Sequence, residues 1–439
     1  MRARPPVDTC HVAYLILFVQ GVGALLPWNV FITAASYFAD RLKDTPVHDS
    51  FLNWFSLAFT LATLVVVALN AAVLRPYLPS PQRKVVVSLI GIAVVLVLTA
   101  ALVKAPSVVG TRFFAISILS IVVASICSAY LQEGLFELTT LFPEIYTQAL
   151  MTGQSAAGFL VSLSACVLTW LHHHPNSFVF LWPLADNSNV ETTAFIYFVC
   201  ACATMVVALA TFFAFQRLPL TRHYLKGDDA FKHRRRSSSN STLELDDSTD
   251  SLLDDDDESE PPRVAANPWK LLYRMRHHAI TVFLTLFVTL ALFPVVTSSI
   301  ESTSMDQTLF VSLGFVLFNL GDLLGRAATA VYLLPHRRLL AAAAFFRLSF
   351  FVIFILCNVR GSPFVVFTQD GVAVAVLLAC AWSNGYLVSV AMMQSPHLVD
   401  RHHRPLAGAI MFLCLCTGLT AGSLASFGLR AILCHCNPF

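Results

Sequence analysis

Long apolar runs dominate the chain, and short polar breaks separate one run from the next. A helix that spans a membrane needs about 20 mostly apolar residues, and about eleven runs pass that test. The runs cover residues 11–38, 51–74, 85–103, 113–140, 145–171, 193–215, 278–300, 308–334, 338–359, 370–395 and 405–433. This pattern predicts an all-α polytopic membrane protein with eleven transmembrane helices.

One long polar segment, residues 216–277, divides the runs into six before it and five after it. It has few apolar residues and carries blocks of like charge, a composition that cannot bury a core. We therefore expect an N-terminal six-helix bundle at 1–215, a disordered cytoplasmic loop at 216–277 and a C-terminal five-helix bundle at 278–439.

Two short motifs lie within the expected loop. An arginine-rich stretch precedes Ser237, Ser238 and Ser239, as in substrates of basophilic kinases; the alternative is a solvated linker that only holds the bundles apart. Leu252-Leu253 is similar to a dileucine sorting signal, but Ser248 stands where such signals carry an acid. The sequence therefore favours the plasma membrane, with the endolysosomal membrane as the alternative.

Composition agrees with a protein that lives in lipid. Of 439 residues, 56% are hydrophobic and 12% are charged, whereas soluble domains are about 25% charged. The net charge of +2 gives no reason to expect a nucleic-acid partner. With eleven spans, the placement of Lys and Arg predicts a cytoplasmic N-terminus and an extracellular C-terminus.

The first apolar run contains Pro27, Trp28 and Asn29 in succession. Proline removes one backbone hydrogen bond, and an asparagine amide at membrane depth needs protein or water to satisfy it. Tryptophan usually prefers the membrane–water interface, from which this position is distant. We therefore expect this stretch to line an internal cavity, with Trp28 as an aromatic platform.

A second polar group lies in the run 308–334. Asp322 and Arg326 are four residues apart, so they share one helix face and can pair, and Asn319 lies one turn back. A sugar hydroxyl could bridge the pair by donating to the carboxylate and accepting from the guanidinium. The alternative is an ion pair that only fixes packing.

The fourth run carries Gln132 followed by Glu133 and Glu137. The Gln132 amide offers a donor and an acceptor in one plane, which suits the edge of a nucleobase. Two carboxylates one turn apart in apolar surroundings must share a proton or a cation, so Glu133 and Glu137 form a candidate proton or cation site. The alternative is pairing with Arg347 or Arg112, or a position near an aqueous vestibule.

Other polar motifs favour packing or solvation. In Thr152-Gly153-Gln154-Ser155, small residues permit close helix approach. The terminal Cys434-His435-Cys436 lacks a second ligand pair at zinc spacing, so we expect no metal and no cofactor. No nucleophile–base pair lies at membrane depth, which argues against an enzyme.

Several segments, in order along the chain, are similar to motifs of the equilibrative nucleoside transporter family, solute carrier family 29. They are Leu25-Leu26-Pro27-Trp28-Asn29, Leu131-Gln132 with Gly134-Leu135-Phe136, Thr152-Gly153-Gln154 with Ala157-Gly158, Phe293-Pro294, Phe318-Asn319 with Asp322 and Gly325-Arg326, Ser383-Asn384-Gly385-Tyr386-Leu387, Ala407-Gly408-Ala409-Ile410-Met411 and Arg430-Ala431-Ile432. Each motif alone is weak, but the ordered set covers nearly the whole chain.

The resemblance implies a major-facilitator-like fold of six plus five helices that moves nucleosides, such as uridine and adenosine, and by extension nucleobases, by alternating access around a central site. Trp28 and Gln132 would then contact the base, and Asp322 and Arg326 would hold the ribose. The implied substrate-binding residues are Leu25, Trp28, Ile32, Gln132, Asp322, Arg326 and Leu419.

The sequence departs from the family pattern at Glu133 and Glu137, where uncharged residues are usual. This departure leaves facilitative and proton-influenced transport open. It also leaves a carrier of organic cations or monoamines of the same family as an alternative. A membrane-embedded enzyme is the alternative from a different class, and no catalytic group supports it.

Overall fold

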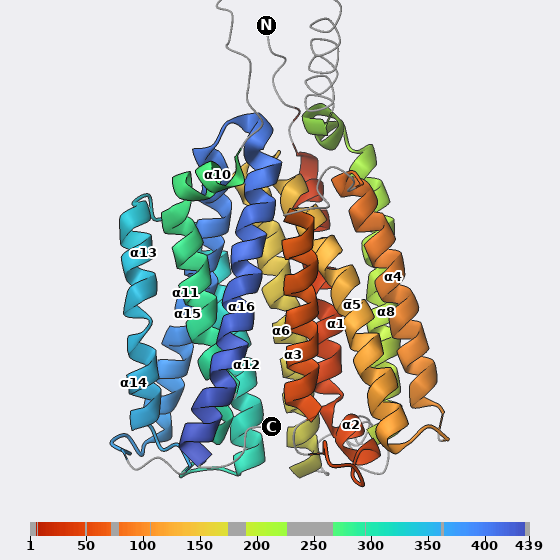
Figure 1. The fold of residues 1–439 in the computed structure, drawn as a ribbon, viewed down its shortest axis with the longest axis vertical. Helices are drawn as coiled ribbons and strands as arrows, with labels where there is room; N and C mark the ends of the chain where they lie inside the picture. Colours follow the sequence, from red (N-terminus) through yellow and green to blue (C-terminus); the bar gives the residue numbers. More distant parts are fainter. Residues whose placement is uncertain are drawn as a thin grey trace, which may run out of the picture.

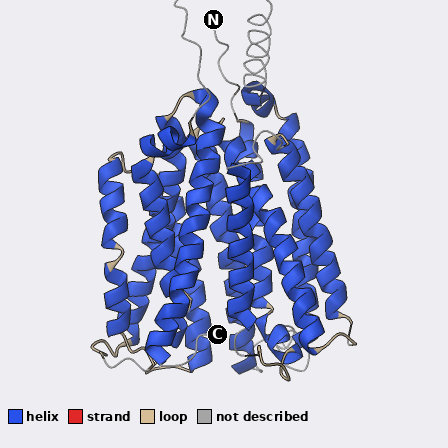
Figure 2. Ribbon diagram, viewed as in Figure 1, coloured by secondary structure: helices blue, strands red, loops and turns tan. Residues whose placement is uncertain are grey.

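The computed structural model is a bundle of long helices, with no β-strand in the part of the chain that it describes (Figure 2). In that part, extended pairing is limited to the isolated bridges Ile300–Val359 and Cys357–Phe367. The described residues are 6, 8–48, 51–71, 79–105, 107–173, 190–225, 267–294, 296–360 and 364–434.

Ten helical stretches in these residues are long and apolar enough to cross a membrane. They comprise α1 (Val12–Thr33), α4 (Pro81–Val103), α5 (Gly110–Thr139), α6 (Glu144–His173), α8 (Val190–Arg217), α11 (Arg276–Leu292), α12 (Gln307–Ala328), α13 (Arg337–Phe346) with α14 (Ser349–Leu356), α15 (Asp370–Gln394) and α16 (Arg404–Cys434). The all-α membrane fold expected from the sequence is thus confirmed.

The count of eleven spans depends on α3 (Phe51–Leu69), whose apolar stretch Trp54–Leu69 is shorter than the others. In Figure 1, α1 and α16 both run from the upper to the lower end of the bundle. Two helices with the same direction require an odd number of crossings from first to last. This geometry favours α3 as an eleventh span, which stays a prediction.

Proline explains two helix features. Helix α1 continues through Pro27, and the Asn29 side chain turns back to donate to the carbonyl oxygen of Leu25 at 3.0 Å. The expected span 278–300 instead ends as α-helix at Leu292, because the residue before Pro294 is restricted to extended backbone.

A short helix, α10 (Pro268–Arg274), forms inside the segment 216–277 that we expected to be disordered. The Asn267 side chain accepts from the backbone N–H of Trp269 and caps the helix, and Pro268 occupies the first turn. The expectation of disorder is therefore wrong for this part. The kinase and sorting motifs lie outside the described residues.

Figure 1 shows α1 to α8 gathered on one side of the molecule and α10 to α16 on the other. The two groups meet where α6 packs against α12 and where α16 packs against α3 and α5. Hydrogen bonds cross this boundary between Ser312 and Thr169 (3.4 Å) and from Thr420 to the carbonyl oxygen of Thr60 (3.3 Å).

Glycine lets α1 and α6 approach closely. A Cβ atom on Gly153 would overlap the carbonyl oxygen of Phe18, and one on Gly21 would overlap that of Leu150. Small residues at such positions let helix backbones touch, which is how helices pack in membranes. The close contact fixes α6 next to α1 and brings the polar side chains of α6 to the boundary between the groups.

Candidate functional site

Asp322 and Arg326 form the predicted ion pair on α12. Arg326 Nε donates to Asp322 Oδ2 at 2.9 Å, and each side chain is 9% exposed. The pairing follows from the four-residue spacing on one helix face. The structure therefore confirms the contact that the sequence predicts.

The pair is held by residues of other helices as well. Ser155 on α6 donates to Asp322 Oδ2 at 2.5 Å, and Asn384 on α15 donates to Asp322 Oδ1 at 2.6 Å. Arg326 Nη1 donates to the carbonyl oxygen of Met151 on α6 at 3.2 Å. Because α6 belongs to one helix group and α12 and α15 to the other, the charged pair bridges the boundary.

These hydrogen bonds make the buried charges tolerable. Removing two ions from water costs more than their attraction returns unless hydrogen bonds satisfy the remaining lone pairs and protons. Asp322 accepts three such bonds, from Arg326, Ser155 and Asn384. Three donors from three helices thus hold the carboxylate, and a ligand hydroxyl could replace those at Oδ2.

Gln132 contacts the same helix, α6, that binds the Asp322–Arg326 pair. Its Oε1 accepts from Gln154 Nε2 at 3.2 Å, and Gln154 directly precedes Ser155 in the chain. Both amides are buried. The Gln132 amide N–H₂ group remains on the side of the amide away from this bond, where it can donate to a ligand.

Trp28 contacts Phe59 of α3, with ring centroids 4.6 Å apart and planes tilted by 33°. Leu25, Ile32 and Leu419 are half-buried, and Leu419 packs on the same apolar cluster as Trp28. Among the predicted polar residues, hydrogen bonds join Asp322 to Arg326, and Gln132 to Gln154. That Trp28, Leu25, Ile32 and Leu419 line the same site stays a prediction.

Glu133 and Glu137 share a cation that the chain itself supplies. Lys84 Nζ lies 3.5 Å from Glu133 Oε1 and 3.2 Å from Glu137 Oε2. Asn70 also donates to Glu133 Oε2 at 2.6 Å. The expected carboxylate pair is present, but the alternative partners Arg347 and Arg112 were wrong.

Sequence reasoning missed Lys84 because the expected span began at residue 85. Helix α4 starts earlier, at Pro81, after Ser80 at the N-cap position, so Lys84 lies in its first turn. Gly134 of α5 lets this turn approach, since a Cβ there would lie 3.1 Å from the Lys84 Cβ. The Ser80-Pro81 pair before the apolar run is the sequence signal that could have predicted the earlier start of this helix.

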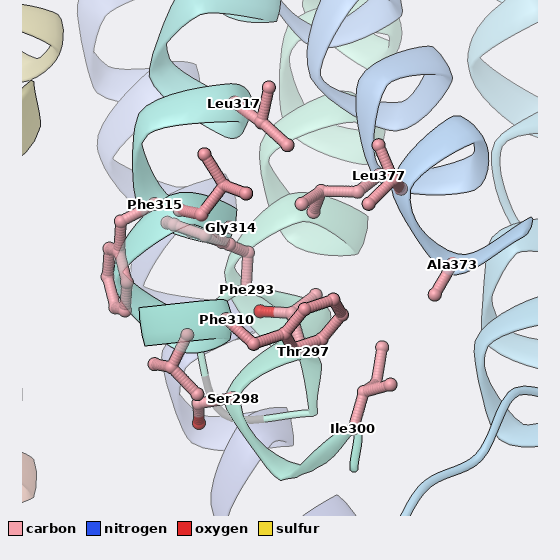
Figure 3. A pocket seen from close by; sticks show the side chains of 13 residues that line it. Phe293, Thr297, Ser298, Ile300, Phe310, Gly314, Phe315, Leu317, Ala373 and Leu377 are labelled. Atoms are coloured by element: carbon pink, nitrogen blue, oxygen red, sulfur yellow. The ribbon is translucent and has the colours of Figure 1, made fainter. Parts of the chain in front are cut away.

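A small apolar pocket lies elsewhere, between α12, α15 and the segment after α11 (Figure 3). Phe293, Phe310 and Leu377 are among its lining residues, and it encloses about 20 Å³. Ligand pockets usually measure about 300–1,000 Å³, so this pocket is too small for a nucleoside. The buried charges of Asp322 and Arg326 mark the candidate site better than this pocket does.

No group of three or more metal-ligating side chains gathers in the described residues. The terminal Cys434-His435-Cys436 motif lies largely outside them, because residues 435–439 are not described.

Comparison with known proteins agrees with this architecture. The family model for nucleoside transporters matches residues 118–431. Equilibrative nucleoside transporter 1 of Mus musculus is 32% identical, with 98% of this chain and 99% of that protein covered. Equilibrative nucleoside transporter 2 of Homo sapiens is 30% identical, with 98% and 100% covered.

Solved structures with a similar fold are transporters of the major facilitator superfamily. The proton:xylose symporter XylE superposes with a TM-score of 0.62 at 11% identity and covers 99% of this chain and 92% of its own. At this identity the likeness shows the fold alone. The sequence match to the family model and to the full-length relatives shows the family, and the chain belongs to the nucleoside transporters.

Proposed function

We propose that this protein carries nucleosides, uridine and adenosine among them, across a membrane by alternating access. The observation that carries the proposal is the Asp322–Arg326 pair, which is buried, satisfied and shared between the two helix groups through Ser155. Ionisable residues at membrane depth are usually functional.

The pair offers the chemistry that a ribose needs. A hydroxyl group can donate to Asp322 Oδ2 while it accepts from Arg326, and it would then replace the direct contact between the two side chains. Gln132 would read the edge of the base, and Trp28, with Leu25, Ile32 and Leu419, would supply apolar surface for its faces. These roles follow the sequence motifs and the positions of the side chains.

A site shared by two helix groups can couple binding to motion. The pair itself belongs to α12. Ser155 and Met151 bind it from α6, and Asn384 binds it from α15. A ligand that replaces the hydrogen bonds from α6 would remove contacts that join the two helix groups beside the Asp322–Arg326 pair. We propose the six-helix and five-helix division, 1–215 and 278–439, as the units that move.

The buried acids support a nucleoside carrier over a carrier of organic cations. Glu133 and Glu137 are the carboxylates that would attract a cation, and Lys84 already lies between them. Asp322 is likewise bound to Arg326. A cationic substrate would have to take the place of an internal ammonium or guanidinium group and leave that positive charge without its carboxylate, whereas a ribose hydroxyl can bridge Asp322 and Arg326 and leave the two charges paired.

Cellular placement belongs to the same proposal. We place the N-terminus in the cytoplasm and the C-terminus outside, with the plasma membrane as the main location and the endolysosomal membrane as the alternative. Ser237, Ser238 and Ser239 are the proposed kinase sites. Antibody access to tags at either end of the chain in intact and permeabilised cells tests this arrangement.

Uptake of radiolabelled uridine and adenosine into cells that lack nucleoside transport tests the function. We expect saturable uptake that needs no sodium, and no such uptake with the isosteric Asp322→Asn variant at equal surface amount. Uptake of tetraethylammonium or serotonin without any nucleoside transport in the same cells would overturn the proposal.

A further inference from the structure

A second arginine, Arg347, lies fully buried behind the Asp322–Arg326 pair. It occupies the junction between α13 and α14, and it is 1% exposed. Arg347 Nη1 donates to the carbonyl oxygen of Cys380 at 2.7 Å and to the Ser383 hydroxyl. Its Nε has no partner in the described residues.

The other end of the guanidinium begins a chain of hydrogen bonds. Arg347 Nη2 donates to Thr289 Oγ1 of α11 at 2.7 Å, and Thr289 Oγ1 donates to Asn384 Oδ1 at 2.8 Å. Asn384 Nδ2 then donates to Asp322 Oδ1 at 2.6 Å. We call this sequence of contacts the Arg347 relay.

The chemistry of the two ends fixes the direction of the relay. Arginine can only donate, and an ionised carboxylate can only accept. Thr289 must therefore accept from Arg347, and the Asn384 amide must present its nitrogen to Asp322. The single hydroxyl hydrogen of Thr289 has two acceptors at 2.8 Å, Asn384 Oδ1 and the carbonyl oxygen of Thr285, and the relay is complete when it points to Asn384. Hydrogen bonds aligned in one direction polarise and strengthen one another in a low dielectric.

Asp322 is the carboxylate at the far end of the relay from Arg347. The carboxylate thus lies between two cations, with Arg326 in direct contact at Oδ2 and Arg347 reaching Oδ1 through two neutral side chains. The two oxygens have different neighbours. Oδ2 faces the exchangeable partners Arg326 and Ser155, whereas Oδ1 faces the relay inside the C-terminal group.

We infer that Arg347, Thr289 and Asn384 are positioning residues that hold Asp322 for substrate. The inference rests on the proposed function. When a ribose hydroxyl takes a place at Oδ2, the contacts of Arg326 and Ser155 must rearrange. The relay keeps Oδ1 bound throughout, so the carboxylate stays correctly turned while its other oxygen changes partner.

Thr289 gives the sharpest test, because its hydroxyl is the middle of the relay. Thr289→Val deletes the hydroxyl while it keeps the side-chain volume. Thr285→Val is the matched control: Thr285 lies one turn earlier on α11, is equally buried, and its hydroxyl has no partner in the described residues. Thr289→Ser keeps the hydroxyl and should restore function.

The measurement is the KM and the surface-normalised Vmax for uridine and for 2′,3′-dideoxyuridine, which lacks the ring hydroxyls. We expect Thr289→Val to raise the uridine KM about three- to tenfold and to leave the dideoxyuridine KM unchanged. Thr285→Val and Thr289→Ser should resemble the wild type for both substrates.

Three outcomes would overturn the inference. A uridine KM in Thr289→Val equal to that of the wild type would show that the relay does not position Asp322. An equal change for both substrates, or for Thr289→Val and Thr285→Val alike, would show a packing role only. A wild-type protein that takes up neither nucleoside would overturn the proposed function and this inference with it.

Discussion

Removing Asp322 should damage the protein more than removing Arg326, although the two form one ion pair. In Asp322→Ala, three donors lose their acceptor: Arg326 Nε, Ser155 Oγ and Asn384 Nδ2. In Arg326→Ala, Asp322 keeps two donors, and the carbonyl oxygen and the sulfur of Met151 lose a partner. The asymmetry comes from the neighbours and not from the pair itself.

The magnitude follows from these contacts. Breaking a buried pair by removing one partner costs about 3–5 kcal/mol, and each stranded donor adds about 1–3 kcal/mol. In Arg326→Ala, the hydrogen bonds that remain on Asp322, each worth about 1.5–3 kcal/mol to a charged group, offset part of the loss. We expect Asp322→Ala to be less stable by at least about 2 kcal/mol.

Thermal unfolding of the two purified variants in the same detergent checks the order, and uridine uptake at equal surface amount checks the function. We expect the lower midpoint for Asp322→Ala and loss of uptake in both variants. The isosteric Asp322→Asn controls for volume. An Arg326→Ala midpoint below that of Asp322→Ala would refute the reasoning from contacts. Normal uptake by either alanine variant would refute the ribose assignment.

Four further predictions concern other parts of the molecule. Trp28→Ala should raise the nucleoside KM about tenfold through loss of stacking, with Trp28→Phe between it and the wild type in uptake assays. Gly153→Ala should cost about 1–3 kcal/mol by forcing Phe18 away, seen as a lower unfolding midpoint than that of Ala157→Ser. Glu133→Gln should lower the unfolding midpoint, because it removes one of the two carboxylates that face Lys84, and an unchanged midpoint would contradict this. Deleting 237–260 should leave the uridine KM unchanged, and a changed KM would contradict a linker role.

Contacts within one helix could be predicted from the sequence. Asp322 and Arg326 are four residues apart, so a single helical turn brings them together whatever the rest of the fold does. The long spans could be found for a similar reason, because lipid requires continuous apolar runs. Both predictions depend only on local periodicity, and the structure confirms both.

Contacts between helices could not be predicted in the same way. Ser155 was interpreted as part of a packing motif, and its bond to Asp322 depends on how α6 lies against α12. Lys84 was placed outside the membrane, because hydropathy locates the start of a span only to within a few residues. Its pairing with Glu133 and Glu137 further depends on the close approach at Gly134.

The buried charges of the two helix groups bear on what the protein can carry. In the N-terminal group, the Lys84 ammonium group lies between the carboxylates of Glu133 and Glu137. In the C-terminal group, the buried charged side chains among the described residues are Asp322, Arg326 and Arg347, which leave one positive charge when all three are ionised.

A neutral substrate adds no charge to either helix group. A cation bound beside Asp322 would add to the excess positive charge of the C-terminal group, where the low dielectric makes like charges costly. A cation bound beside Glu133 would compete with Lys84, which is tethered and already in place. From the sequence alone, these charged residues fit either a nucleoside carrier or a cation carrier. The partners that the structure gives them favour nucleosides. Exchange of Lys84 for methionine should test this, because it would leave the acids without their internal cation and should allow organic cations to compete with uridine uptake.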